Sequence, residues 1–234
     1  EFRRVLFRSI KGTYLMKRTI LAVALSTASA LSFAGDSYIT GNVQHHSNPE
    51  FSGSRVTSTI EVGHTFATTD RGGLTVLAEI DGIKLGNNAA SNDAGPFLTL
   101  GFEQAYNINE RLWVAAGYQH LLQDGDSIQA RPLVKIGYHF DNGVSISNRT
   151  RLHLDQTDNV GADDDVRTDN AISYQLPAYP VQVKYNNVYM WDAEVMDHEF
   201  RATWTRNGVQ PYAEWRNQGD RANNAMVVGA TVSF

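Results

Sequence analysis

The sequence predicts an all-β protein, a transmembrane antiparallel β-barrel of about twelve strands. Three observations predict this fold. Apolar and polar residues alternate along many short segments, turn sequences separate these segments, and an export signal precedes them. With 42% hydrophobic and 19% charged residues, the chain is too polar for a bundle of membrane-spanning helices. It contains no cysteine, which excludes disulfide frameworks and thiolate metal sites.

Residues 16–34 have the pattern of a cleavable signal peptide. Met16 is followed by two basic residues, an apolar stretch from Ile20 to Leu31, and small residues at −3 and −1 from a cleavage point after Ala34. A basic start, a short apolar middle and such a cleavage site direct a bacterial protein to export. Residues 1–15 match no part of this pattern, so we interpret them as a scar of cloning or translation. The predicted barrel covers residues 35–234.

The mature chain is acidic. Removing residues 1–34 leaves 200 residues with 14 basic and 24 acidic side chains, a net charge of −10. Nucleic-acid binding requires a basic face, so we expect no nucleic-acid partner. The histidines are scattered, and Asp163, Asp164 and Asp165 lack the glycine-punctuated spacing of a calcium loop. We therefore expect no metal site and no cofactor, and interpret the aspartates as a solvated loop.

Twelve segments of the mature chain alternate between apolar and polar residues, and none has a helical period. Val181-Gln-Val-Lys-Tyr185 is one clear example. Because successive strand residues point to opposite faces, strict alternation places one face on an apolar medium and the other on a polar one. The predicted strands are residues 37–46, 53–66, 73–86, 96–106, 112–122, 127–140, 144–155, 167–176, 181–191, 198–205, 210–217 and 224–234.

The connections between these strands alternate in length. The even ones are short, with Asn-Gly pairs at 142–143 and 207–208 that suit tight hairpins. Most of the odd ones are longer and acidic, and these cover 87–95, 156–166, 191–197 and 217–223. Short turns at one end and long loops at the other are typical of outer-membrane barrels with both termini on the periplasmic side.

Parity along each strand divides the side chains between the two faces. It places Val134, Ile136, Ile146 and Leu152 outward, toward lipid. It places a set of basic side chains inward, with Arg55 as a further candidate. This inward set is Arg131, Lys135, Arg149, Arg151, Lys184, Arg201 and Arg216.

We expect the lumen to be basic and to conduct anions, because rings of Arg and Lys mark anion pores. The alternative is a narrow structural barrel in which these charges only pair with inward acids. The acids available for such pairing are Glu61, Glu79, Glu103, Glu199 and Glu214.

The mature length, the strand number, the inward Arg and Lys rows and the terminal Phe234 resemble the oligogalacturonate-specific porin family, whose relatives include a sialic-acid channel. The resemblance implies a monomeric diffusion channel of the outer membrane for acidic oligosaccharides, with the seven inward bases as the substrate pathway. It also implies contacts with outer-membrane lipid and lipopolysaccharide, and recognition of Phe234 by the outer-membrane assembly machinery. We expect no enzymatic activity.

An enzyme is the main alternative. His45-His46-Ser47-Asn48 contains the His-x-Ser-Asn string of outer-membrane phospholipases and lipid A deacylases. Parity places His45 and Ser47 outward, as such a hydrolase requires. The histidine would also need an orienting partner on the next strand, where Thr59 cannot serve and Glu61 has inward parity. A barrel that has neither activity, such as an adhesin, is a third alternative.

Overall fold

The computed structural model describes residues 35–86, 94–157 and 163–234, which form twelve strands and one short helix. The predicted signal peptide and residues 1–15 lie outside the described residues. The helix is α2 (Pro49–Ser52). The strands are β1 (Gly35–His46), β2 (Val56–Thr69), β3 (Gly72–Lys84), β4 (Phe97–Asn107), β5 (Leu112–Gln123), β6 (Asp126–His139), β7 (Val144–Asp155), β8 (Asp165–Gln175), β9 (Val181–Met190), β10 (Val195–Trp204), β11 (Val209–Gln218) and β12 (Asn223–Ser233).

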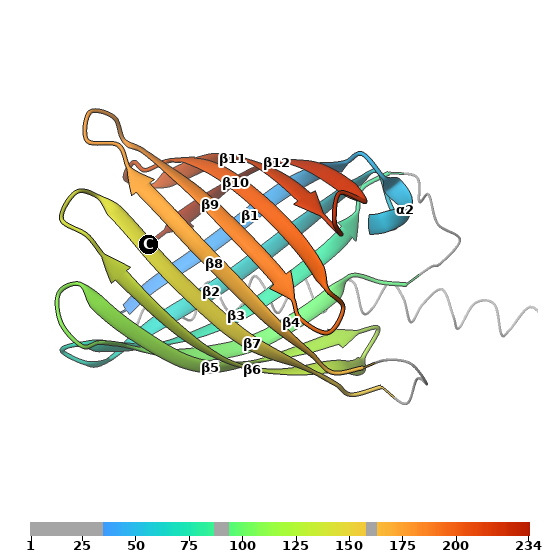
Figure 1. Ribbon diagram of the computed structural model, residues 1–234, viewed down its shortest axis with the longest axis horizontal. Coiled ribbons are helices and arrows are strands. Elements are labelled where there is room, and N and C mark those ends of the chain that lie inside the picture. The colour runs from blue at the N-terminus through green and yellow to red at the C-terminus, as the bar shows by residue number, and fades with distance from the viewer. Residues whose placement is uncertain (1–34, 87–93, 158–162) are drawn as a thin grey trace, which may run out of the picture. The chain divides into compact units, whose positions relative to one another are not determined.

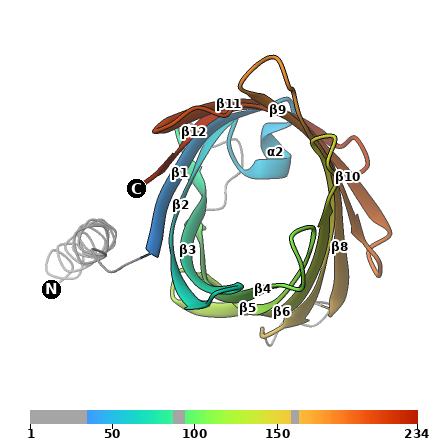
Figure 2. The ribbon, with the colours of Figure 1, turned by 90° about the vertical axis from the view of Figure 1, so that its left-hand side faces the viewer.

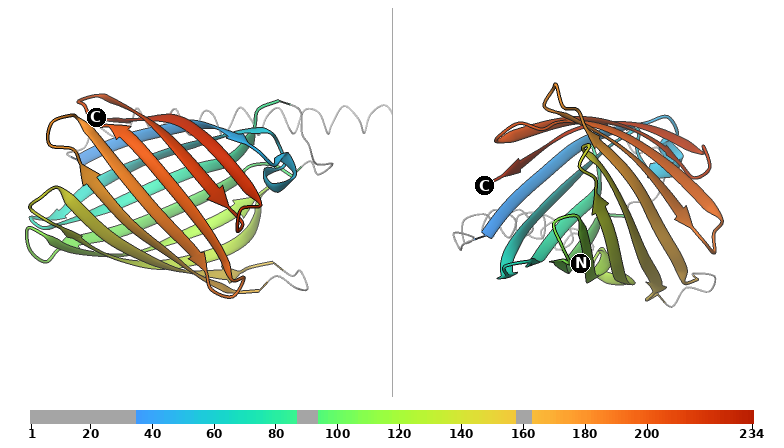
Figure 3. Two further views of the ribbon diagram at one scale, coloured as in Figure 1. Left: turned by 45° about the horizontal axis from the view of Figure 1, so that its top comes forward. Right: turned by 60° about the vertical axis from the view of Figure 1, so that its left-hand side comes forward.

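The strands form a closed antiparallel barrel in which sequence neighbours are spatial neighbours and β1 closes against β12 (Figure 1). Ser37 and Phe234 exchange two backbone hydrogen bonds of 2.9 Å, so β1 begins and β12 ends at one rim. Figure 3 shows the strands crossing the wall obliquely, as barrel closure requires. The all-β barrel of twelve strands is thus confirmed, while the side of the membrane on which the termini lie remains a prediction.

Strand bounds agree with the predicted ones to within about two residues, except at β2, which lies three residues later than predicted, and around β10. This strand begins at Val195 rather than at 198. The Met196 N–H donates to the Asp220 carboxylate at 2.9 Å, and the Asp220 N–H donates to the Met196 carbonyl oxygen at 3.3 Å, which extends the strand at its start. The predicted long loop over 191–197 is therefore only a short turn over 191–194. The fifth connection is also tight, with Asp124 and Gly125 both at positive φ.

Three of the odd connections, 47–55, 85–96 and 156–164, are longer than any even one. The first carries α2, which begins with Asn48 accepting a hydrogen bond from the Glu50 N–H and ends at Gly53 with φ of 70°. Figure 2 shows α2 inside the ring of strands when the barrel is seen end on. A side chain at Gly219 would meet the Phe51 ring, so this close approach packs the α2 loop against the turn between β11 and β12.

The predicted parity of the two barrel faces is confirmed. Val134 and Ile136 on β6 are 57% and 50% exposed, whereas Leu133, which directly precedes Val134 and points the other way, is 4% exposed. The outer face is apolar except at a few positions such as Asn148 and Asn170, whose amides hydrogen bond to each other at 2.8 Å. Such an outer face suits the hydrocarbon core of a membrane.

No helix in the described ranges is long and apolar enough to cross a membrane.

Candidate functional site in the lumen

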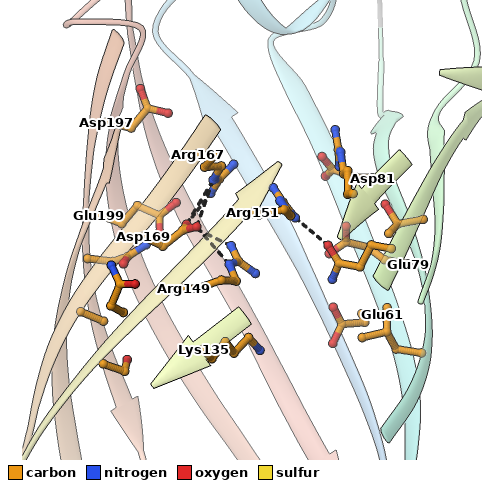
Figure 4. A pocket seen from close by; sticks show the side chains of 18 of the residues that line it. Glu61, Glu79, Asp81, Lys135, Arg149, Arg151, Arg167, Asp169, Asp197 and Glu199 are labelled. Atoms are coloured by element: carbon orange, nitrogen blue, oxygen red, sulfur yellow. Dashed lines mark hydrogen bonds and ion pairs between the residues drawn. The ribbon is translucent and has the colours of Figure 1, made fainter. Parts of the chain in front are cut away.

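The barrel encloses a cavity of about 630 Å³ whose wall is dominated by charged side chains (Figure 4). Seven are basic and six are acidic. The bases are Arg131, Lys135, Arg149, Arg151, Arg167, Lys184 and Arg216, and the acids are Glu61, Glu79, Asp81, Asp169, Asp197 and Glu199. The expectation of a basic lumen is therefore corrected, because the bases exceed the acids in this wall by only one.

Six of the seven bases predicted from parity line this cavity, and Arg201 does not. Arg201 instead pairs with Glu214 and lies over the Tyr212 ring, 4.2 Å from its centroid. Arg55 precedes β2, is exposed, and does not line the cavity. Sequence reasoning missed Arg167 because the predicted strand began at that residue. Its parity with Asp169 is the signal that could have found it.

Strand register brings the basic residues together on one wall. Lys135 on β6 lies opposite Arg149 on β7, and Arg151 lies opposite Arg167 on β8. Arg149 and Arg151 alternate along β7, so both point into the lumen and sit nearly 7 Å apart. Gln119 on β5 lies opposite Arg131 and extends this wall.

Part of the basic set is neutralised by carboxylates. Asp169, whose side chain is 7% exposed, accepts from Arg149 at 3.0 Å and from Arg167 at 2.7 Å. The Glu214 side chain is 2% exposed, lies between Arg201 and Arg216, and pairs with both. Lys135 pairs with Glu103. Internal pairing thus involves Glu103 and Glu214, two of the acids named for the alternative, and Asp169, which was not among them.

The other three cavity cations, Arg131, Arg151 and Lys184, form no ion pair with any carboxylate among the described residues. Arg131 donates to the Gln129 side-chain oxygen at 2.8 Å. Arg151 donates from Nη1 to Gln119 at 2.6 Å and from Nε to His153 Nε2 at 2.9 Å. These partners are neutral acceptors, so they satisfy the donors and orient the guanidinium groups without cancelling their charge.

The acidic side of the cavity lies on β2 and β3. Glu61 and Glu79 are directly opposite in the register, and Asp81 follows two residues later on the same face. Tyr38 donates to Glu61 at 2.7 Å, and Thr59 donates to Asp81. No ion pair involves these three carboxylates within residues 35–86, 94–157 and 163–234. We call Glu61, Glu79 and Asp81 the acidic wall.

The acidic wall lies across the lumen from the basic side chains of β8 and β9, Arg167 and Lys184. In a ring of twelve strands, β2 is six places from β8, and β3 is six places from β9. Figure 4 shows Glu61, Glu79 and Asp81 across the cavity from Arg149 and Arg167. The acidic wall therefore faces a side of mixed charge, where Asp169, Asp197 and Glu199 lie among the basic side chains.

The geometry does not favour the hydrolase alternative. His45 lies opposite Met226 on the outer face and makes no side-chain hydrogen bond with any described residue. The candidate partners on β2 turn inward, where Thr59 contacts Gln44 and Asp81, and Glu61 lines the cavity. Ser47 Oγ accepts from the Asn224 N–H at 2.8 Å, a contact that stabilises the rim rather than activating a nucleophile.

Asp163 and Asp164 are exposed, as expected of a solvated loop, and two carboxylates of this segment also accept hydrogen bonds from backbone N–H groups. Asp165 begins β8, and its carboxylate accepts from the backbone N–H groups of Asp192 and Ala193 at 3.0 and 3.3 Å. Asp164 accepts from the Asp155 N–H at 2.8 Å. These carboxylates therefore organise turns at the rim.

No protein-family model and no curated protein sequence matches the chain. Solved structures do. KdgM porin has a TM-score of 0.62 at 12% identity, with 84% of this chain and 99% of that chain covered. NanC porin has a TM-score of 0.62 at 10% identity, with 83% of this chain and 98% of that chain covered.

The chain has the fold of these porins. Outer membrane phospholipase A from Escherichia coli shares it less closely, with a TM-score of 0.56 at 11% identity, covering 86% and 98%. At such identities the similarity concerns the fold, and the function has to be argued from the lumen.

Proposed function

We propose that the mature chain is a diffusion channel of the outer membrane for anionic oligosaccharides such as oligogalacturonates. The observation that carries the proposal is the set of cavity cations without a carboxylate partner, Arg131, Arg151 and Lys184. A buried charge that the protein does not itself neutralise attracts a counter-charge from solution. The apolar outer face and the fold shared with KdgM and NanC support the membrane location.

Uronate carboxylates are suitable counter-charges. A guanidinium group stays charged and can bind a carboxylate through two parallel hydrogen bonds. Side chains nearly 7 Å apart on one strand can hold neighbouring carboxylates of one chain and pass them along. Lys135 and Arg149 complete the row. Because each pairs with a carboxylate of the protein, Glu103 or Asp169, each binds a sugar carboxylate less strongly. Weak contacts suit transport, because conduction requires release as well as capture.

The structural neighbours support the same substrate class. One solved structure with a TM-score of 0.61 and 15% identity, covering 84% of this chain and 99% of that one, is described as KdgM porin in complex with disordered oligogalacturonate. We propose that Phe234, exposed at the end of β12, is the residue through which the assembly machinery recognises the chain, and that lipopolysaccharide contacts the outer face.

Single-channel recording in planar bilayers tests the proposal. Trigalacturonate should block the current for longer than neutral maltotriose of the same length. Arg131→Gln, Arg151→Gln and Lys184→Gln should each shorten the block. Arg111→Gln is the matched control, because Arg111 is exposed and pairs with Asp141 in a turn outside the cavity. Equal blockade by the two sugars, or a cation-selective pore, would refute the proposal.

A further inference from the structure

The acidic wall is an unusual feature for a channel that admits only anions. Glu61 and Glu79 are direct cross-strand neighbours, and like charges in that position destabilise a sheet. Asp81 adds a third carboxylate on the same face. Their hydrogen bonds come from Tyr38 and Thr59, which are neutral donors. Three carboxylates therefore face the lumen, and none of them forms an ion pair with a basic side chain among the described residues.

Because the cavity wall carries charges of both signs, the electrostatic energy that a ligand gains on entering depends on the ligand's own charges. A purely anionic chain is attracted by Arg131, Arg151 and Lys184 but repelled by the acidic wall. With seven bases and six acids, these effects largely cancel for a group midway between the two sides. A molecule with charges of both signs gains at each side, because each of its groups faces an opposite charge.

We propose that the lumen is selective for acidic oligosaccharides that also carry free ammonium groups. This rests on the proposed channel function and narrows its substrate class. The sugar carboxylates bind the guanidinium and ammonium groups of Arg131, Arg151 and Lys184. The sugar ammonium groups donate to Glu61, Glu79 and Asp81. An ammonium group is a strongly hydrated point charge with three donors, which several adjacent carboxylates can accept together. A sugar hydroxyl can donate to the same oxygens but brings no compensating charge.

The test compares two probes that differ in the ammonium group alone. One is a hyaluronan tetrasaccharide, whose amino sugars are acetylated and neutral. The other is the same tetrasaccharide after removal of the acetyl groups, used at about pH 6 so that its amines are protonated. Both carry the same carboxylates. In single-channel recordings the deacetylated probe should block the wild-type pore about tenfold longer, the effect of one hydrogen bond between charged partners.

The Glu61→Gln, Glu79→Gln, Asp81→Asn triple variant should lose this difference and block equally with both probes. Glu110→Gln is the matched control, because Glu110 is an exposed carboxylate in the turn between β4 and β5. If the triple variant does not assemble, the two dwell times on the wild-type channel still decide. Equal dwell times of the two probes on the wild type would overturn this inference.

That failure is distinguishable from failure of the proposed function. If both hyaluronan probes block longer than neutral maltotetraose, the pathway for acidic sugars stands and only the ammonium preference is refuted. If neither blocks longer than maltotetraose, the channel function for acidic sugars is refuted as well.

Discussion

Replacing Arg151 changes the lumen charge at a side chain that no carboxylate neutralises, so its effect on ion selectivity can be worked out. The cavity cations exceed the carboxylates by one. Arg151→Gln removes this excess, Arg151→Glu turns it into a deficit of one, and Glu79→Gln doubles it. We expect the permeability ratio of anions to cations to rise in the order Arg151→Glu, Arg151→Gln, wild type, Glu79→Gln.

The size of each step follows from Coulomb's law. A unit charge about 7 Å from a permeating ion contributes about 0.6 kcal/mol at the dielectric constant of water. It attracts one sign and repels the other, so the ratio changes by about 1.2 kcal/mol before screening. At 0.1 M salt, with a Debye length of about 10 Å, this falls to about 0.6 kcal/mol, or about threefold per unit charge. At 1 M salt, with a Debye length of about 3 Å, the step shrinks to about 1.2-fold.

Reversal potentials across planar bilayers measure this ratio directly, first in dilute and then in concentrated KCl gradients. The exposed-site variant Arg111→Gln should give the wild-type value. If Arg151→Gln and Glu79→Gln shift the reversal potential in the same direction, charge counting in the cavity is wrong. The same holds if the steps persist unchanged in concentrated salt.

Three further predictions concern the barrel wall and the rim. Ile146→Arg, on the lipid-facing side two residues into β7, should cost roughly 1–2 kcal/mol of folding free energy in vesicles, between the values for an interface and for the bilayer midplane, whereas its neighbour Ser147→Arg faces the lumen and should cost little; equal losses in urea titrations would mean that the two faces are wrongly assigned. Glu214→Gln leaves two cations without their shared carboxylate and should cost about 3 kcal/mol, while Asp141→Asn, which breaks an exposed pair, should leave the urea midpoint unchanged. Finally, the protein should not cleave phospholipid when calcium is present, and turnover that disappears in Ser47→Ala would establish the hydrolase instead.

The strands could be predicted closely because each has one lipid-facing side. An apolar solvent outside the barrel forces period-two alternation on every strand, and this signal does not depend on the neighbouring strands. β7 was therefore predictable to its exact bounds, Val144–Asp155. β10 was not, because its first residues are held by Asp220, a residue of the turn between β11 and β12. Contacts between segments far apart in sequence leave no local pattern.

The charge balance of the lumen was less predictable than the direction of its side chains. Parity shows that Arg149 and Asp169 both point inward, but only the register of β7 against β8 places them opposite each other. Likewise, the sequence contains Glu61 and Glu79 as inward acids without indicating that they are neighbours on a separate wall. The register of a strand pair depends on turns and packing along its whole length.

Parity treats the seven predicted bases as equal members of one row, and the structure divides them into two kinds. For a carboxylate passing through the lumen, Arg149 and Arg216 are already engaged by Asp169 and Glu214, so binding there requires displacing or sharing an internal partner. Arg151 carries its charge without such a partner and binds the same carboxylate more strongly. A substrate that moves between Arg151 and Arg149 therefore alternates between stronger and weaker contacts. Under the proposed function, this alternation would let the lumen hold an acidic sugar long enough to select it and still release it.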